Sequence, residues 1–306
     1  MANPYETKRY LDEYLLFHYG KPADLCAFDI LPRDLLRFHE RIRKECLLPI
    51  QRAGRAGSLP CRSVIAKAGP LRAAAALRGR AGSPLPAATI GLLDKVTVRR
   101  AVPNFVAPAT KFGTPMNEPI RALDIGCAVG RFTFELARVA DDVLGIDNSR
   151  SFITAARNLA RKGSANIRIH ESGSHFVSKK ITLPKNFRAP NVTFAVGNAL
   201  KLAEPPNGPY HVVAAINLLC RLPSPRTFLR QLPRLIAPGG QFILASPFSW
   251  LDTFTPPSEW LSPDAVIKIL RPHFRLARRR DLPFLIREHR RKYQLVISHV
   301  LTFVRK

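Results

Sequence analysis

The stretch that decides the fold is Ala-Leu-Asp-Ile-Gly-Cys-Ala-Val-Gly-Arg at residues 122–131, followed by Val-Leu-Gly-Ile-Asp at residues 143–147. The first segment reads as an apolar strand that runs into a glycine-rich turn and a helix. The second is an apolar strand that ends in a carboxylate. This order forms a nucleotide-type cofactor cleft at the carboxyl edge of a parallel sheet. We therefore predict an α/β fold with a doubly wound, mostly parallel, Rossmann-like sheet.

The glycine turn is compatible with more than one kind of ligand. A dinucleotide-binding turn needs G-x-G-x-x-G, so that backbone amides can approach a pyrophosphate. Here the middle position is Ala128, and no lysine stands where a P-loop would need one. Asp124, just before the first glycine, is placed to neutralise a cation. A packing turn without a ligand is the remaining alternative, and the carboxylate of Asp147 at the second strand end disfavours it.

The chain continues the same alternation of strands and helices. A strand at residues 192–196 leads to Asn198, whose side-chain carbonyl can accept a hydrogen bond from an exocyclic amine or simply cap the turn. A second strand at residues 211–216 ends at Asn217, where acceptor-facing groups lie in such sheets. A helix over about 226–235, a Pro-Gly-Gly turn and a strand at 241–245 follow. These elements support the predicted sheet.

The pattern Asp-x-Gly-x-Ala-x-Gly at residues 124–130 resembles the first motif of class I S-adenosylmethionine-dependent methyltransferases. The resemblance implies that Asp124 and the turn hold the methionine end of S-adenosylmethionine, and that Asp147 accepts both ribose hydroxyls. The residues expected at this cofactor are Asp124, Gly126, Cys127, Ala128, Gly130, Asp147, Asn148, Asn198, Ala199 and Asn217.

Further segments narrow the resemblance. Residues 5–20, 217–223, 246–256 and 283–289, read with the turn, are similar to the mercaptohistidine N-methyltransferase domain of ovothiol biosynthesis. This resemblance implies methyl transfer to an imidazole nitrogen of 5-thiohistidine, which gives ovothiol A. The enzyme would mainly align nucleophile, methyl group and leaving sulfur in a dry site. A small amino acid is then the substrate, and a separate sulfoxide synthase is the expected supplier.

A zwitterionic acceptor needs a cation for its carboxylate and an acceptor for its ammonium group. Arg221 and Arg287 are candidate carboxylate clamps, and Glu288 is the candidate for the ammonium group. A base or acceptor such as His289, His18 or Tyr19 would hold the useful imidazole tautomer. Tyr14 and His18 share a helix face and suggest a lid, with a purely packing helix as the alternative. The residues expected at the acceptor are Tyr14, His18, Tyr19, Asn217, Arg221, Arg287, Glu288 and His289.

Three parts are expected along the chain: an N-terminal helical lid segment at 1–46, a basic low-complexity insertion at 47–119 and the cofactor-binding domain at 120–306. The insertion is rich in Ala, Gly, Pro, Ser and Arg and carries eleven Lys or Arg against two acidic residues. Such a composition buries too little apolar surface to offset chain entropy, so we predict disorder, apart from a short helix suggested at residues 71–77. A second, smaller insertion is expected around residues 170–190.

The formal net charge of +26 raises a rival function, methylation of RNA, because a basic chain attracts polyanions. However, no Asn-Pro-Pro-aromatic motif follows the strand at 211–216, so nucleic acid is expected to bind only non-specifically through the insertion. A methyltransferase that acts on another small molecule and an inactive protein that only binds S-adenosylmethionine are further alternatives. Five scattered cysteines, no signal-peptide core and no long apolar run predict a cytoplasmic protein without zinc or membrane contact.

Overall fold

In the computed structural model, the described residues are 4–26, 33–51, 110–111, 118–184, 187, 190–202 and 209–306. Most of the predicted insertion at 47–119 lies outside the described residues, and so does the short helix that its sequence suggests at 71–77. Both ends of that predicted insertion are described, and they belong to the fold as set out below.

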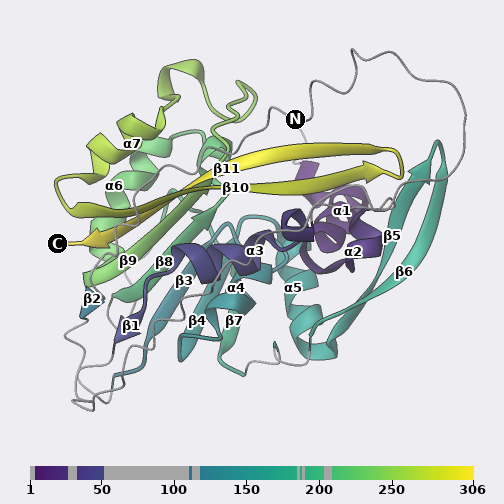
Figure 1. The fold of residues 1–306 in the computed structure, drawn as a ribbon, viewed down its shortest axis with the longest axis horizontal. Helices are drawn as coiled ribbons and strands as arrows, with labels where there is room; N and C mark the ends of the chain where they lie inside the picture. Colours follow the sequence, from purple (N-terminus) through teal and green to yellow (C-terminus); the bar gives the residue numbers. More distant parts are fainter. Residues whose placement is uncertain are drawn as a thin grey trace, which may run out of the picture. The chain divides into compact units, whose positions relative to one another are not determined.

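A seven-stranded sheet forms the centre of the described fold, with strand order β10-β11-β9-β8-β3-β4-β7 (Figure 1). Its strands are β3 (Arg121–Ile125), β4 (Asp142–Asp147), β7 (Val192–Val196), β8 (Tyr210–Ile216), β9 (Ile236–Ser246), β10 (Phe274–His289) and β11 (Lys292–Arg305). The strands β7, β4, β3, β8 and β9 pair in parallel, whereas β11 pairs antiparallel with both β9 and β10. The predicted mostly parallel, doubly wound sheet is confirmed.

The strand order reverses next to β3. The chain runs from β3 outward through β4 to β7, and then returns to place β8 on the other side of β3. In open α/β sheets, ligands bind outside the carboxyl ends of the strands at such a switch point. The topology therefore locates a ligand cleft beyond Ile125 and Ile216.

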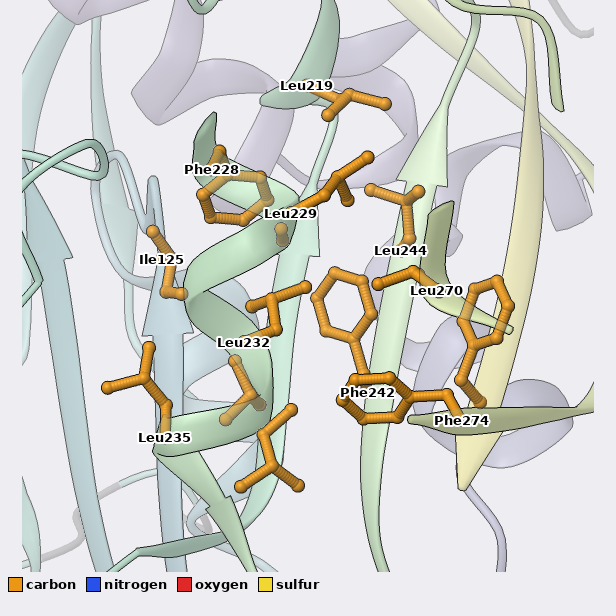
Figure 2. Close-up of a cluster of buried hydrophobic side chains, with 14 of the residues drawn as sticks. Ile125, Leu219, Phe228, Leu229, Leu232, Leu235, Phe242, Leu244, Leu270 and Phe274 are labelled. Carbon is orange, nitrogen blue, oxygen red and sulfur yellow. The ribbon is translucent and has the colours of Figure 1, made fainter. Parts of the chain in front are cut away.

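Helices cover both faces of this sheet. They are α1 (Lys8–Tyr19), α2 (Pro22–Leu25), α3 (Phe38–Arg41), α4 (Arg131–Leu136), α5 (Arg150–Lys162), α6 (Pro225–Leu235) and α7 (Pro263–Leu270). Figure 2 shows Phe228, Leu229 and Leu232 of α6 packed against Phe242 and Leu244 of β9. On the other face, Phe38 of α3 and Phe132 of α4 pack against the alternate strand residues. This alternation is the period-2 pattern of a sheet buried on both sides.

Two smaller strand pairs correct the predicted boundaries. A hairpin of β5 (Ser164–Ser172) and β6 (His175–Thr182) occupies the region of the smaller insertion but begins earlier than predicted. The strands β1 (Ile50–Gln51) and β2 (Thr110–Lys111) pair in parallel.

The predicted boundary between the N-terminal segment and the insertion, after residue 46, lies a few residues too early. Leu48 is buried, its N–H donates to Gln241 Oε1 at 2.9 Å, and its carbonyl accepts from Gln241 Nε2 at 3.0 Å. Gln241 is itself fully buried in β9, so this reciprocal pair satisfies its amide. The N-terminal segment thus extends to Gln51, and a disordered stretch cannot begin at residue 47.

The N-terminal helix lies between two hairpins. Figure 1 shows the long β10–β11 hairpin reaching past α1 toward β5 and β6, and the N–H of Arg290 donates to the carbonyl of Glu171 in β5 at 3.2 Å. The apolar side of α1 joins the cluster that also holds Phe152 and Ile153 of α5. No helix in the described ranges is long and apolar enough to cross a membrane.

Candidate active site

A cavity of about 1150 Å³ opens at the carboxyl ends of β3, β4, β7 and β8. Asp124, Asp147, Val196 and Asn217, at or just beyond these strand ends, line it. Side chains from α1, α3, β10 and β11 complete the walls. The cavity therefore occupies the place that the strand order predicts for a ligand.

The glycine turn is fixed against the end of β4. The N–H groups of Gly126 and Cys127 donate to the carbonyl of Ile146 at 2.8 and 2.9 Å, and the N–H of Ala128 donates to Asp147 Oδ2 at 2.9 Å. Gly126 has φ 73° and Ala128 has φ 47°. A left-handed alanine costs energy, so the carboxylate of Asp147 helps to hold the turn in its shape.

Gly130 has a packing role, which corrects its assignment to the cofactor. It does not line the cavity but caps the N-terminus of α4 with φ 85°. A Cβ at this position would lie 2.5 Å from Phe194 Cζ. Both the backbone conformation and the close ring therefore require glycine here.

Asp124 is the most deeply buried acidic group in the cavity wall, with 1% of its surface exposed. Its Oδ2 accepts a hydrogen bond from Thr133 Oγ1 at 2.7 Å, while Oδ1 is buried without a partner among the described residues. The pKa of this carboxyl is raised to about 7, mainly by burial; the hydrogen bond from Thr133 opposes this rise, and the nearby charge of Asp147 adds to it. A buried acceptor without a partner is costly, and a cationic donor would satisfy it.

Asp147 ends β4 with both oxygens engaged by backbone. Oδ1 accepts from the N–H of Ser149 and Oδ2 from the N–H of Ala128, each at 2.9 Å. Burial nevertheless raises its pKa, and these backbone bonds oppose the rise. A carboxylate offers about four acceptor sites, so capacity for two hydroxyl groups remains.

The two predicted asparagines both line the cavity, with partners that narrow their roles. Asn198 Oδ1 accepts from the N–H of Leu200 at 2.8 Å, which is the turn-capping bond that the sequence left open. Asn217, with φ 55°, has Oδ1 bonded to Ser298 Oγ at 2.6 Å. Each side chain can still offer a ligand its amide N–H₂ and the second lone pair of its Oδ1. The predicted residues Cys127, Asn148 and Ala199 line the cavity as well.

The lid face predicted for α1 is on the cavity. Tyr14 and His18 both line it, and the Tyr14 ring lies 4.8 Å from the ring of Phe152 at the start of α5. Tyr19 does not line the cavity, which corrects its assignment to the acceptor. Its hydroxyl donates to the carbonyl of Val129 at 2.8 Å, so Tyr19 ties α1 to the glycine turn.

Strand alternation divides the residues predicted on β10. Phe284, Ile286 and Glu288 face the cavity, whereas Arg287 and His289 belong to the other side. Arg287 donates to the carbonyl of Asp24 at 2.6 Å and to Glu171 Oε1 at 2.5 Å. Arg287 therefore cannot clamp a ligand in the cavity, and its predicted role is wrong.

His289 is the second correction on β10. Its ring lies 5.7 Å from the ring of His170 in the β5–β6 hairpin, and its Nδ1 accepts from the N–H of Arg291 at 3.2 Å. These contacts lie between the two hairpins and outside the cavity wall. His289 therefore cannot select an imidazole tautomer in the cavity.

Two predicted charged groups remain at the cavity. Arg221 donates to the carbonyl of Ser249 at 2.8 Å and lies 5.3 Å from the centre of the Phe254 ring. Glu288 accepts from Gln294 Nε2 at 2.6 Å and pairs with Lys292 at 2.7 Å. The bond from Lys292, followed by that from Gln294, lowers the pKa of Glu288, so this carboxyl is ionised near neutral pH.

Sequence reasoning missed two groups, one in the cavity wall and one at the N-terminus of α5 beside it. His39 of α3 lines the cavity beside His18, with ring centres 4.4 Å apart. Glu6 accepts from the N–H groups of Arg150 and Ser151 at 3.0 and 3.2 Å, at the N-terminus of α5. An acidic residue at a helix N-terminus is a recognisable cap, but a partner 144 positions away leaves no local sequence signal.

The sequence is similar to those of known methyltransferases. Residues 98–293 match the family model described as a methyltransferase domain. Ubiquinone biosynthesis O-methyltransferases of Maricaulis maris and of a Caulobacter species are 27% and 28% identical to the chain over 129 and 130 residues. Each alignment covers 42% of this chain, and the chain spans only 41% of the length of these curated relatives.

Solved structures with a similar fold include two methyltransferases. The N-methyltransferase NodS of Bradyrhizobium japonicum, in complex with S-adenosylhomocysteine, has a TM-score of 0.42 at 18% identity, over 61% of this chain and 78% of NodS. Magnesium protoporphyrin IX methyltransferase of Synechocystis has a TM-score of 0.40 at 20% identity, over 60% and 74% of the two chains. The family match spans well over half of the sequence, and this chain therefore belongs to the family of methyltransferase domains, enzymes that transfer a methyl group.

Proposed function

We propose that the chain binds S-adenosylmethionine at the carboxyl ends of β3 and β4 and methylates an imidazole nitrogen of 5-thiohistidine, giving ovothiol A. The observation that carries the cofactor half is the buried, unpartnered Oδ1 of Asp124 beside the glycine turn. The acceptor half rests on the resemblance described above and on the polar groups that remain in the cavity.

The residues at the strand ends fit this cofactor. Asp124 supplies a buried acceptor for an ammonium group, and Asp147 keeps lone pairs for two vicinal hydroxyls. Asn198 is our candidate for the adenine ring, where its amide N–H₂ can donate to a ring nitrogen while its carbonyl accepts from the N–H of Leu200. When bound, the cofactor supplies an electrophilic methyl group on a sulfonium sulfur.

The protein's own contribution is alignment and exclusion of water. The Tyr5 ring lies 6.0 Å from the Tyr14 ring and 6.2 Å from the Phe254 ring, and all three line the cavity. Glu6 fastens the Tyr5 segment to the N-terminus of α5, directly after Asp147. An aromatic cover over a positioned nucleophile is what methyl transfer requires, since no strong acid or base is needed to activate a sulfonium.

A zwitterionic amino acid matches two of the charged groups that line the cavity, Arg221 and Glu288. Arg221 has five N–H donors, and its bond to Ser249 leaves others for a carboxylate. Glu288 has lone pairs beyond those used by Gln294 and Lys292 and is our candidate for the ammonium group. With Arg287 and His289 removed from the site, Arg221 and Glu288 are the charged groups to test.

The proposal also concerns the source of the substrate and the compartment in which the reaction takes place. Under this proposal, a sulfoxide synthase supplies the 5-thiohistidine, and the methyl transfer takes place in the cytoplasm. Nucleic acid would bind only non-specifically, through the basic residues between 52 and 111.

The test is incubation of the purified chain with S-adenosylmethionine and 5-thiohistidine, followed by mass spectrometry for one added methyl group. Histidine, a ubiquinone precursor and bulk RNA serve as competing acceptors. We expect methylation of 5-thiohistidine, a reduced rate in Arg221→Lys and a reduced rate in Glu288→Gln. Methylation of RNA or of the ubiquinone precursor, without any on 5-thiohistidine, would overturn the proposed acceptor while leaving the cofactor assignment in place.

A further inference from the structure

Four rings from three elements pack against one another and form one part of the cavity wall. The ring of Phe17 in α1 lies 5.2 Å from His18, 5.2 Å from His39 of α3 and 5.3 Å from Phe284 of β10. The His18 and His39 rings are 4.4 Å apart. All four side chains line the cavity, and we call them the ring chamber.

The ring chamber adjoins the part of the cavity assigned to the cofactor. Tyr14 connects the two, because its ring lies 4.8 Å from Phe152 at the start of α5 and 5.9 Å from His18. Tyr14 is one helical turn before His18 on α1, so both project from the same helix face. A molecule in the chamber would therefore sit next to the cofactor and within the same enclosed space.

Both imidazoles in the chamber are uncharged at neutral pH. Burial, helped by the positive charge of Arg131, lowers the pKa of His18 to about 3. Burial lowers the pKa of His39 well below its usual range, and His18 and Arg131 add to the effect. Arg131 is held by the carbonyl of His18 at 3.0 Å and by Glu135 at 3.1 Å.

His18 also has an unused polar atom. Its Nδ1 is buried and has no hydrogen-bond partner among the described residues. An unbonded imidazole nitrogen in an aromatic wall is a cost that a bound donor or acceptor would remove. Aromatic walls favour a flat ring, which packs against them by offset or edge contacts.

We propose that the ring chamber receives the methyl acceptor, as a planar nitrogen heteroaromatic ring whose N–H is bonded by His18 and His39. This inference rests on the proposed function and names the residues that recognise the acceptor's ring, with His39 as a binding residue that the sequence did not single out. A neutral imidazole offers one donor and one acceptor, so the pair can hold one tautomer of the ring.

The lack of charge on this pair has a consequence for the methyl donor. A sulfonium is cationic, and a protonated histidine in the adjoining chamber would repel it. Uncharged imidazoles bind the acceptor without that repulsion. The same argument predicts that a permanent positive charge in the chamber weakens the binding of S-adenosylmethionine more than the binding of S-adenosylhomocysteine, which has a neutral sulfur.

The first test uses the protein saturated with S-adenosylhomocysteine and titrated with 5-thiohistidine in a calorimeter. Loss of a buried hydrogen bond should weaken acceptor binding in His39→Leu by about 10-fold to 100-fold. His39→Gln, which keeps a donor and an acceptor, should recover much of that loss. His289→Leu is the matched control, because His289 is on the other side of β10 and outside the cavity.

Binding of S-adenosylhomocysteine and the unfolding temperature are measured for each variant to confirm folding. An unchanged acceptor affinity in a folded His39→Leu variant would overturn the proposal, and so would equal losses in His39→Leu and His289→Leu. His39→Lys adds the charge test. We expect its affinity for S-adenosylmethionine to fall several-fold more than its affinity for S-adenosylhomocysteine.

A second measurement separates this inference from the proposed function. The protein labelled with ¹⁵N-histidine is titrated with 4-methylimidazole, and the ring signals of His18 and His39 are followed by NMR, assigned with the His39→Gln variant. If these signals shift but 5-thiohistidine does not bind, the chamber binds a heteroaromatic ring and the proposed acceptor is wrong. If 4-methylimidazole leaves both signals unmoved, the chamber is refuted for any acceptor.

Discussion

Binding of S-adenosylmethionine should expel a proton from Asp124. The carboxyl is buried, and its pKa is raised to about 7 by burial, so near pH 6 it carries a proton in about nine of ten molecules. A cofactor ammonium group facing the unpartnered Oδ1 favours the ionised form. Cofactor binding therefore converts a neutral acid into a carboxylate and releases its proton to the buffer.

The size of this release follows from the same pKa. We expect about 0.9 protons released per cofactor bound at pH 6 and about 0.1 at pH 8. Isothermal titration calorimetry in buffers of different ionisation enthalpy measures this number as the slope of the observed heat. The Asp124→Asn variant provides the background, because it keeps the shape of the side chain but has no proton to lose. Equal release by the wild type and Asp124→Asn at pH 6 would refute the argument.

The pH dependence of the stability of the cofactor-free protein should report on the same carboxyl group. The folded pKa of about 7 lies above the ordinary value of 3.8, so the unfolded chain releases the proton first as pH rises. The stability of the cofactor-free protein should thus be full below about pH 4, fall as the pH rises to about 7 and then level off. The ceiling on this loss is about 4 kcal/mol, and Asp124→Asn should flatten the profile.

Three other substitutions test the proposed cofactor site and the packing of the glycine turn. Asp147→Ala should weaken S-adenosylmethionine binding by about 10-fold to 100-fold in calorimetry. Asp142→Ala, at the opposite end of β4, should leave the binding unchanged. Equal effects of the two substitutions would contradict a role of Asp147 in binding the cofactor. Glu6→Gln should speed cofactor dissociation several-fold in stopped-flow measurements, because it weakens the bonds to the start of α5, and an unchanged rate would argue against a lid. Gly130→Ala should cost about 3 kcal/mol in denaturant unfolding. Gly173→Ala, which has φ 52° but open space around it, should cost less, and a similar cost would mean that ring packing is not the cause.

Most of the residues proposed for the cofactor could be predicted to line one cavity, because their sequence signals are local. The turn from Asp124 to Gly130 and the carboxylate of Asp147 lie within one strand-helix-strand unit, where spacing determines geometry. Of these residues, the structure gives a different role only to Gly130. The side chain nearest to a Cβ added at Gly130 is Phe194, which comes from a strand more than sixty residues later. A packing requirement imposed from that distance has no pattern in the local sequence.

The acceptor half could not be predicted as well, and β10 shows why. Arg287, Glu288 and His289 were treated as one functional block, although consecutive strand residues point to opposite faces. Reading that period would have kept Glu288 and rejected its two neighbours. His39 is a different case, because its meeting with His18 depends on how α3 returns to α1, which only tertiary packing determines.

The charges along the cavity are consistent with transfer of a methyl group from a cationic donor to an uncharged ring. Carboxyl groups stand where the donor is expected, at Asp124 and Asp147, and the adjoining ring chamber holds only neutral side chains. Methyl transfer moves positive charge away from the sulfonium and toward the acceptor. Neutral imidazoles that bond the acceptor's N–H help to stabilise this developing charge, whereas protonated ones would oppose it. For this reason burial of His18 and His39, which would be a liability for a general base, suits a site whose task is to orient its acceptor.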